Sequence, residues 1–291
     1  MLTLSRPKQW YKNFLIFVPL VFSLHLFNIH SLSLSLLGFV ILCLSSGGSY
    51  AINDLVDYER DLKHPIKNQR PLAKGLISKP KAVVFALSLI SVSILLSLFL
   101  GYMFLIINCM LIASMILYSL YVKHIFMLDV FAISVNYVLR AVAGALALNL
   151  KISPWLIMGV FFLALLLALG KRKNEILFLK ESANDHRKIL SEYDNEILNY
   201  AIATTSATII LAYSLYSMTG PVGIDDWRLI FTIPIAFFIL LTYVNQTFTG
   251  KYKGRELNDL ITSNKTLIIS SIVFVVSIVI LLYFVPSGYL K

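Results

Sequence analysis

Residues 53–61, which read NDLVDYERD, form a polar stretch in an otherwise apolar chain. In a helix, Asp54, Asp57 and Asp61 fall at positions i, i+3 and i+7, and Asn53 lies one turn before Asp57, so all four share one face. Carboxylates about 5–6 Å apart repel by about 3 kcal/mol per pair at an effective dielectric constant near 20. An apolar chain has little reason to build such a face unless a cation neutralises it.

The ligand atoms indicate which cation. Carboxylate and amide oxygens suit Mg²⁺, which usually keeps several waters and bridges to substrate phosphates. The pattern therefore predicts a magnesium site formed by Asn53, Asp54 and Asp57, with Asp61 either supporting it or binding a second ion.

Basic residues follow the acidic stretch. Lys67, Arg70 and Lys74 come just downstream and can hold phosphate oxygens. Acids that bind a metal, followed by bases that bind phosphate, indicate a diphosphate substrate. The alternative is an exposed charged loop between two membrane helices, but the spacing and the neighbouring bases favour the site.

The composition is that of a polytopic membrane protein. Of the 291 residues, 58% are hydrophobic and 14% are charged, whereas a soluble domain has about 25% charged residues. Cys43 and Cys109 both lie in apolar runs, so no disulfide framework is implied. A membrane helix needs about 20 mostly apolar residues. Nine segments qualify: 11–28, 31–52, 81–100, 102–121, 128–148, 154–171, 197–218, 228–248 and 266–286.

The positive charges predict the topology. With the N-terminus in the cytoplasm, 21 of the 25 Lys and Arg residues lie on the cytoplasmic side, which is a strong positive-inside bias. The net charge of +10 is therefore a topology signal, and a nucleic-acid partner is not needed to explain it. The three longer polar loops, 53–80, 172–196 and 249–265, all face the cytoplasm, and nine spans leave the C-terminus outside.

Four stretches resemble the UbiA superfamily of intramembrane prenyltransferases, and within it the decaprenyl-phosphate phosphoribosyltransferase branch. They are Arg6-Pro7-Lys8-Gln9-Trp10-Tyr11-Lys12-Asn13; the acidic motif with His64-Pro65, Lys67, Arg70-Pro71 and Gly75; Tyr118-Ser119 through Lys123 to Asp129, then Arg140-Ala141 and Gly144; and Gly170-Lys171-Arg172 with Glu175. The acidic motif alone marks only the superfamily. The first and last stretches point to the phosphoribosyl branch.

The sequence departs from the aromatic prenyltransferases of that superfamily, which carry a second aspartate-rich motif after the sixth helix. Here residues 171–175 read KRKNE, and Asp185 and Asp194 do not form an Asp-x-x-x-Asp pattern. Basic residues thus stand in place of a second metal cluster, which suits two phosphorylated substrates.

The resemblance implies an all-α bundle of nine membrane helices, one domain over residues 1–291, with a central cavity open to the cytoplasm and laterally to lipid. It implies Mg²⁺-dependent transfer of 5-phosphoribose from 5-phosphoribosyl 1-diphosphate to a polyprenyl phosphate, releasing diphosphate, for lipid-linked sugar synthesis at the plasma membrane. A homo-oligomer is compatible with the sequence. One alternative is an enzyme that moves an isoprenoid from its diphosphate to an aromatic or lipid acceptor. A lower-ranked one is a lipid or solute transporter, but the matching broken helices of two related halves are not seen.

The candidate residues combine this resemblance with position. We assign catalysis to Asp54, Asp57, Lys12 and Arg140. We assign substrate binding to Gln9, Asn13, Asn53, Lys67, Arg70, Tyr118, Lys123, Lys171, Arg172 and Glu175.

Several of these residues have plainer explanations. The alternative for Lys12 is an interfacial lysine that extends to water. The alternative for Tyr118 is an interfacial aromatic residue. Lys171 and Glu175, at i and i+4, are otherwise a salt bridge on a helix surface. Arg140 lies within an apolar segment, where an arginine costs about 2.5–3.5 kcal/mol. Its alternative role is a structural ion pair with another helix.

Overall fold

The computed structural model describes residues 1–63, 67–179, 193–219, 227–249 and 264–286, and every regular element in those ranges is a helix. Eight helices within the described ranges are long and apolar enough to cross a membrane. The prediction of an all-α, multi-pass membrane protein is confirmed. The count of nine spans, the laterally open cavity and the orientation of the termini stay predictions.

The chain folds as two compact units. The first comprises Met1–Leu20 and His25–Ile152, and the second comprises Val21–Leu24 and Ser153–Lys291. A single domain over residues 1–291 stays a prediction.

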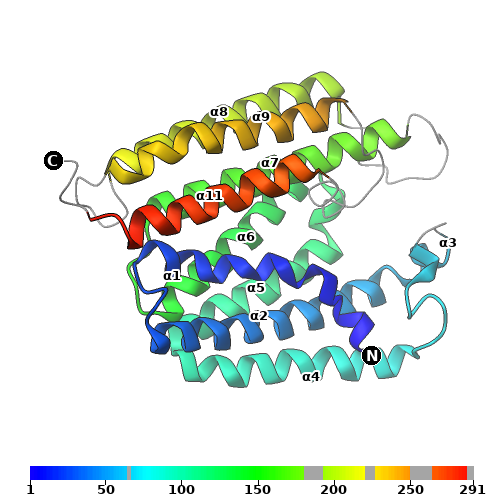
Figure 1. The fold of residues 1–291 in the computed structure, drawn as a ribbon. Coiled ribbons are helices and arrows are strands. Elements are labelled where there is room, and N and C mark those ends of the chain that lie inside the picture. The colour runs from blue at the N-terminus through cyan, green and yellow to red at the C-terminus, as the bar shows by residue number, and fades with distance from the viewer. Residues whose placement is uncertain (64–66, 180–192, 220–226, 250–263, 287–291) are drawn as a thin grey trace. The chain divides into compact units, whose positions relative to one another are not determined.

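Four long helices dominate the first unit: α2 (Ile29–Val56), α4 (Lys79–Ser97), α5 (Tyr102–Leu120) and α6 (Leu128–Ala147). Figure 1 shows α2 and α4 side by side over most of their length. Gly48 permits this approach, because a Cβ there would lie 2.9 Å from the Ala86 carbonyl oxygen of α4. The shorter elements are η1 (Leu2–Ser5), η2 (Pro7–Phe17), α3 (Tyr58–Lys63), η3 (Lys67–Gln69), η4 (Leu98–Leu100) and η5 (Val122–His124), together with the first three residues of α1 (Val18–Phe22).

The first predicted span, 11–28, differs from expectation. It is a 3₁₀ helix of 11 residues, η2, followed by the five-residue α1. A 3₁₀ helix has three residues per turn, so residues three apart share a face. Asn13, Ile16 and Pro19 are all buried. This stripe, with a spacing of three residues, faces the protein. Composition alone did not distinguish η2 from an α-helix, because composition holds no information on spacing.

The geometry of η2 matches that of α6. A three-residue step along a 3₁₀ helix rises about 6 Å, the same as a four-residue step along an α-helix. Asn13 contacts Arg140, and three residues later the backbone of Ile16 lies against Gly144, four residues after Arg140. The two helices therefore stay in register over this contact. Ile16 and Leu139 also share an apolar core with residues of α2 and α5.

Gly144→Ala should break this register. A Cβ at Gly144 would lie 2.2 Å from the Ile16 carbonyl oxygen, and that backbone cannot move without displacing η2. We expect the melting temperature to fall by about 5 °C or more. The matched control is Gly159→Ala in α7 (Pro154–Leu179), where nothing lies within 4 Å of the new Cβ. Differential scanning fluorimetry of both variants checks this, and equal melting temperatures would contradict it.

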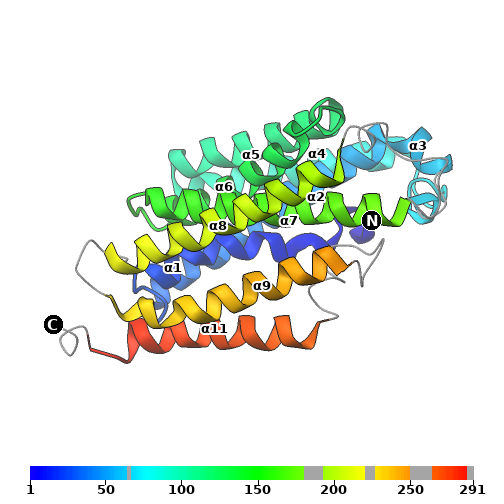
Figure 2. The same ribbon diagram turned by 90° about the horizontal axis from the view of Figure 1, so that it is seen from above.

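The second unit contains α7 (Pro154–Leu179), α8 (Asn195–Thr219), η7 (Trp227–Thr232), α9 (Ile233–Thr249) and α11 (Lys265–Tyr283). Figure 2 shows α9 and α11 side by side. The predicted polar loop after residue 171 begins later than expected, because α7 continues to Leu179. Lys, Arg and Glu are good helix formers, so the charge of this segment marks the end of the span without ending the helix.

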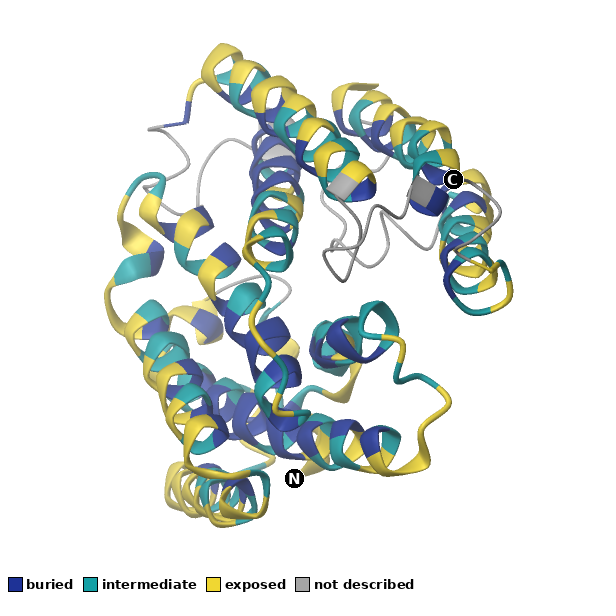
Figure 3. Cartoon of the chain, turned by 90° about the vertical axis from the view of Figure 1, so that its left-hand side faces the viewer, coloured by how far each residue is buried: buried dark blue, intermediate teal, exposed yellow. Residues whose placement is uncertain are grey.

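The burial pattern fits a lipid environment. Many of the helices carry both exposed and buried residues along their length (Figure 3). Many of the exposed side chains are large and apolar, among them Val84 at 68% and Leu95 at 62% exposure on α4. Meanwhile Ser93 and Ser97 of the same helix are buried. Apolar residues outside and small polar residues inside are typical of membrane helices.

Candidate active site

The acidic stretch lies where α2 ends and α3 begins. Asp57 is the residue between the two helices, and its N–H donates to the Asn53 carbonyl at 3.0 Å. The N–H of Asp61 donates in turn to the Asp57 carbonyl at 2.8 Å. Helical hydrogen bonds thus continue through the junction. This continuity keeps the aspartates close to the predicted helical spacing, with Asn53 half-buried at its start.

Arg70 bridges two of the carboxylates. Its Nη1 lies 3.1 Å from Asp54 Oδ1 and 2.5 Å from Asp61 Oδ2. Both aspartates are buried, at 2% and 3% exposure. Burial raises the pKa of Asp61 above its usual value, the charge of Arg70 opposes this, and the negative charges of Asp54 and Asp57 raise it further. The carboxylates therefore feel one another's charge, as the spacing predicts.

Arg6 is a member of this cluster that the sequence did not single out as a site residue. Its Nη2 donates to Asp54 Oδ1, and its guanidinium lies over the Tyr50 ring, 5.4 Å from the centroid. Its backbone has φ +48° between η1 and η2, a conformation that costs a non-glycine residue about 1–3 kcal/mol. The only available signal was its place in the opening Arg-Pro motif.

Lys123 pairs with the third carboxylate. Its Nζ lies 2.6 Å from Asp57 Oδ1, and its side chain is 3% exposed. It comes from η5, which follows α5. The structure therefore places Lys123, predicted as a substrate-binding residue, beside the aspartates. Hereafter Arg6, Asp54, Asp57, Asp61, Arg70 and Lys123 are called the charged cluster.

The cluster has a donor set that suits a magnesium–diphosphate group. No three His, Cys, Asp or Glu side chains in the described ranges converge on a single ion. Mg²⁺ bound with a diphosphate needs only one or two carboxylates, because substrate oxygens and water complete its shell. Asp54 and Asp61 already hold one cationic nitrogen between them, so their oxygens fit around a shared positive charge.

Arg140 lies in a separate polar network of the first unit. It is 3% exposed. Its Nε donates to Asn13 Oδ1 at 2.8 Å, and its Nη1 donates to the Asn136 carbonyl at 2.6 Å. Asn13 in turn donates to Cys43 Sγ on α2 at 3.3 Å. Among the described residues no carboxylate contacts Arg140, so the structural ion pair considered above is not found there.

Four other predicted residues belong to the same unit and are half-buried: Gln9, Lys12, Lys67 and Tyr118. Lys12 Nζ lies 5.9 Å from the centroid of the Tyr11 ring. Their assignment to catalysis or substrate binding stays a prediction.

Lys171, Arg172 and Glu175 belong to the second unit. Lys171 Nζ lies 3.9 Å from Glu175 Oε1, the surface pair anticipated from their spacing. Arg172 is buried and donates to Glu175 Oε2 at 2.5 Å. Lys173, next in the chain, donates to Asn199 Oδ1 and lies 3.5 Å from the centroid of the Phe248 ring. The basic end of α7 is thus packed onto α8 and α9.

Three residues of the sequence motifs lie outside the described ranges, namely His64, Pro65 and Asp185. Asp194 is described, and its carboxylate accepts the N–H of Glu196 at 2.6 Å, at the start of α8. Asp194 therefore acts as a helix cap.

Comparison with known proteins adds to this geometry. The chain is 30% identical to decaprenyl-phosphate phosphoribosyltransferase of Corynebacterium glutamicum over 294 residues, 98% of this chain and 87% of the relative. It is 27% identical to the protein of the same name from Mycolicibacterium smegmatis over 248 residues, 81% of this chain and 78% of the relative. Both likenesses extend far beyond the charged cluster.

The fold has a counterpart among solved structures. A UbiA homolog from Archaeoglobus fulgidus bound to GPP and Mg²⁺ superposes with a TM-score of 0.71 at 19% identity, over 96% of this chain and 98% of that one. Residues 14–188, which include the end of η2, both aspartate-bearing helices and Arg140, match the model of the UbiA prenyltransferase family. With its membrane helices, its acidic motif and these likenesses, the chain belongs to the UbiA prenyltransferase family.

Proposed function

We propose that this transferase moves 5-phosphoribose from 5-phosphoribosyl 1-diphosphate to a polyprenyl phosphate and releases diphosphate. The observation that carries the proposal is the charged cluster, in which three buried or half-buried carboxylates are matched by Arg6, Arg70 and Lys123. The names of the relatives from Corynebacterium and Mycolicibacterium support the same reaction.

The mixture of charges is what this pair of substrates needs. Carboxylates alone would serve a metal, and cations alone would serve a phosphate. The cluster has both, from segments far apart in the chain, since Arg6 and Asp54 are 48 residues apart and Lys123 and Asp57 are 66 apart. A donor with a diphosphate and a 5-phosphate, together with an acceptor phosphate, would use both kinds of group.

Asp54, Asp57 and Asp61, with Asn53, are the residues that would hold Mg²⁺. When bound, the ion polarises a diphosphate leaving group and fixes its position. In this proposal the guanidinium groups of Arg6 and Arg70 and the ammonium group of Lys123 exchange their present carboxylate partners for phosphate oxygens.

The reaction requires little acid–base chemistry from the protein. A lipid phosphate is already an anionic nucleophile at neutral pH, so it needs no general base. The remaining requirements are orientation and stabilisation of charge on the departing diphosphate. Lys12, Asn13 and Arg140 are proposed to orient one of the phosphorylated substrates. Lys171, Arg172 and Glu175 stay proposed substrate-binding residues of the second unit.

The rival reaction is transfer of an isoprenoid to an aromatic or lipid acceptor. It is favoured by one observation, the fold shared with a homolog bound to GPP and Mg²⁺. The basic residues at 171–173 and the helix-capping role of Asp194 weigh against it, because a second aspartate motif is missing from the described residues there. Both reactions use the acidic motif, so only the substrates separate them.

A transfer assay with both kinds of donor tests the proposal. Purified protein is incubated with Mg²⁺, decaprenyl phosphate and 5-phosphoribosyl 1-diphosphate labelled in the ribose, and organic-phase label is counted. We expect lipid-linked label that disappears with EDTA and returns with added Mg²⁺. In parallel reactions, labelled geranyl diphosphate is supplied with an aromatic or lipid acceptor. Transfer of the isoprenoid without any lipid-linked phosphoribose would replace the proposal by the rival.

A further inference from the structure

A pocket of about 330 Å³ lies in the first unit beside the charged cluster but shares none of its residues. Three of its lining residues, Val56, Lys79 and His124, are terminal residues of three apolar spans. The ends of membrane spans lie at the boundary between hydrocarbon and headgroups. The pocket is therefore at the depth of lipid headgroups.

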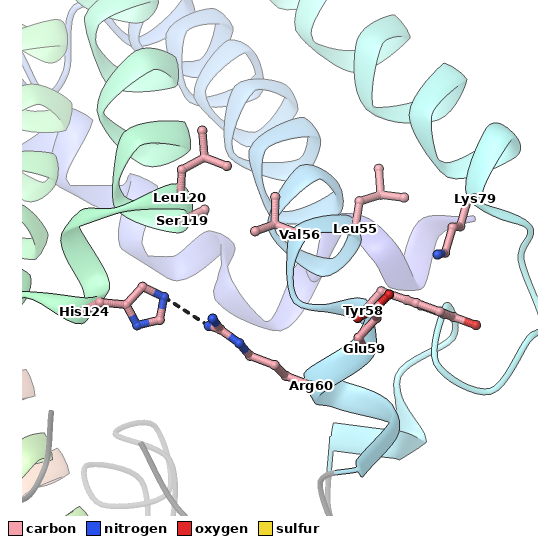
Figure 4. Close-up of a pocket in the computed structure, with 9 residues that line it drawn as sticks. All are labelled: Leu55, Val56, Tyr58, Glu59, Arg60, Lys79, Ser119, Leu120 and His124. Atoms are coloured by element: carbon pink, nitrogen blue, oxygen red, sulfur yellow. Dashed lines mark hydrogen bonds between the residues drawn. The ribbon is translucent and has the colours of Figure 1, made fainter. Parts of the chain in front are cut away.

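The polar side of the pocket is basic. Figure 4 shows Arg60 of α3 facing His124 of η5, with Lys79 of α4 near Tyr58. Arg60 Nη1 donates to His124 Nε2 at 3.0 Å, and Lys79 Nζ lies 4.0 Å from the centroid of the Tyr58 ring. Because arginine can only donate, His124 Nε2 carries no proton in this contact.

The formal charge of the lining selects the class of ligand. Arg60 and Lys79 are positive, Glu59 is negative and His124 is neutral in this contact, which leaves one net positive charge. A phosphodiester has one negative charge and matches it. A phosphomonoester carries about 1.5 to 2 negative charges at neutral pH, so a polyprenyl phosphate or free phosphate matches less well.

The apolar side of the pocket fits the rest of a lipid. Leu55, Val56 and Leu120 line it, and Val56 and Leu120 remain 43% and 41% exposed. Binding pockets for whole small molecules are about 300–1,000 Å³. A volume at the bottom of that range suits a headgroup whose acyl chains continue along the helix surfaces.

We propose that this pocket binds the headgroup of an anionic phospholipid, with Arg60 and Lys79 on its phosphodiester and Val56 and Leu120 against its glycerol and first methylenes. The bound lipid would hold α3 to η5 from outside. Arg60 is one residue before Asp61, and His124 is one residue after Lys123, so the lipid steadies the two segments that supply part of the charged cluster. Lipid binding itself does not depend on the reaction proposed above.

Native mass spectrometry of the full-length protein, titrated with phosphatidylglycerol, tests the proposal without any turnover. The variant is Arg60→Gln with Lys79→Gln. Its matched control is Lys63→Gln with Lys81→Gln, two exposed lysines on the same helices that do not line the pocket. We expect the first variant to lose the tightest phosphatidylglycerol site by about tenfold or more in affinity, and the control to keep it. Arg60→Lys with Lys79→Arg, which keeps both charges, should also retain the site.

Competition arms identify the ligand. Phosphatidylcholine, inorganic phosphate and decaprenyl phosphate are each added to the complex with phosphatidylglycerol, and none should displace the tightest lipid at an equal concentration. Displacement by phosphatidylcholine would show a site without charge selection. Displacement by inorganic phosphate or by decaprenyl phosphate would make it a free-phosphate or substrate site. Each of these results, like equal lipid binding by the variant and its control, would overturn the proposal.

Discussion

Asp54→Asn is expected to lower kcat for phosphoribosyl transfer by about a hundredfold or more, while leaving the fold intact. The amide keeps the shape of the side chain but removes its negative charge. Arg6 and Arg70 both contact Asp54 Oδ1, and the proposed metal would lose an anionic ligand. The Mg²⁺ concentration at half-maximal rate should rise in parallel. Rates measured over a range of Mg²⁺ at saturating donor give both values.

Glu196→Gln is the matched control, because it removes an exposed carboxylate in the first turn of α8. Its rate should stay within about twofold of the unchanged protein, as expected of a surface substitution. If Asp54→Asn kept full activity and the same Mg²⁺ dependence, the charged cluster could not be the reaction centre. In that case a transporter function would regain support.

Arg140→Met is expected to lower kcat/KM for one of the phosphorylated substrates by about a hundredfold without lowering the melting temperature. Arg140 is buried, and the groups that accept its hydrogen bonds are neutral: an amide, a carbonyl and a thioether. A buried charge without a counter-charge is unfavourable, so an apolar residue of similar size removes that cost, and Asn13 Oδ1 still accepts from Ser46 Oγ at 3.4 Å. If it binds phosphate, its removal costs activity but not stability.

Arg228→Met supplies the contrasting control. Arg228 is also buried in a predicted span, but its guanidinium donates to the Leu282 carbonyl at 3.3 Å and to the Val285 carbonyl near the end of α11. The Asn136 carbonyl that Arg140 contacts lies inside α6, whereas these two carbonyls lie at and after the C-terminal end of α11 and Pro286 provides no N–H there. Arg228 therefore satisfies backbone groups that have no helical donor, and we expect this variant to lose stability and to keep its activity per folded molecule. Kinetics and scanning fluorimetry on both variants separate the two roles. A fall in stability with unchanged kcat/KM for Arg140→Met would make Arg140 structural.

The parts of the fold that depend on local pattern were predictable. The spacing of Asp54, Asp57 and Asp61 placed them together because helical contacts are short in sequence. The longer spans were recognised from apolar length alone. The helical ending of α7 was placed too early because the charged residues after Lys171 were assigned to the polar loop 172–196, although Lys, Arg and Glu favour helix.

The cations of the cluster depended on distant contacts. Nothing near Arg6 in the sequence indicates Asp54, 48 residues away, or the φ of +48° that directs its side chain. Lys123 was predicted only through the family likeness, since its partner Asp57 is 66 residues away. The metal, the substrates and the individual roles of these residues stay predictions.

The rise of η2 changes how residues should be counted across a bilayer. A helix with 2.0 Å per residue covers about 22 Å with 11 residues, and the five residues of α1 add about 7.5 Å. Sixteen residues thus reach the roughly 30 Å of a hydrocarbon layer, a depth for which an α-helix needs about 20. Counting rules based on α-helices therefore underestimate the reach of this segment, and the polar residues Lys8, Gln9, Lys12 and Asn13 of η2 itself lower its mean hydropathy.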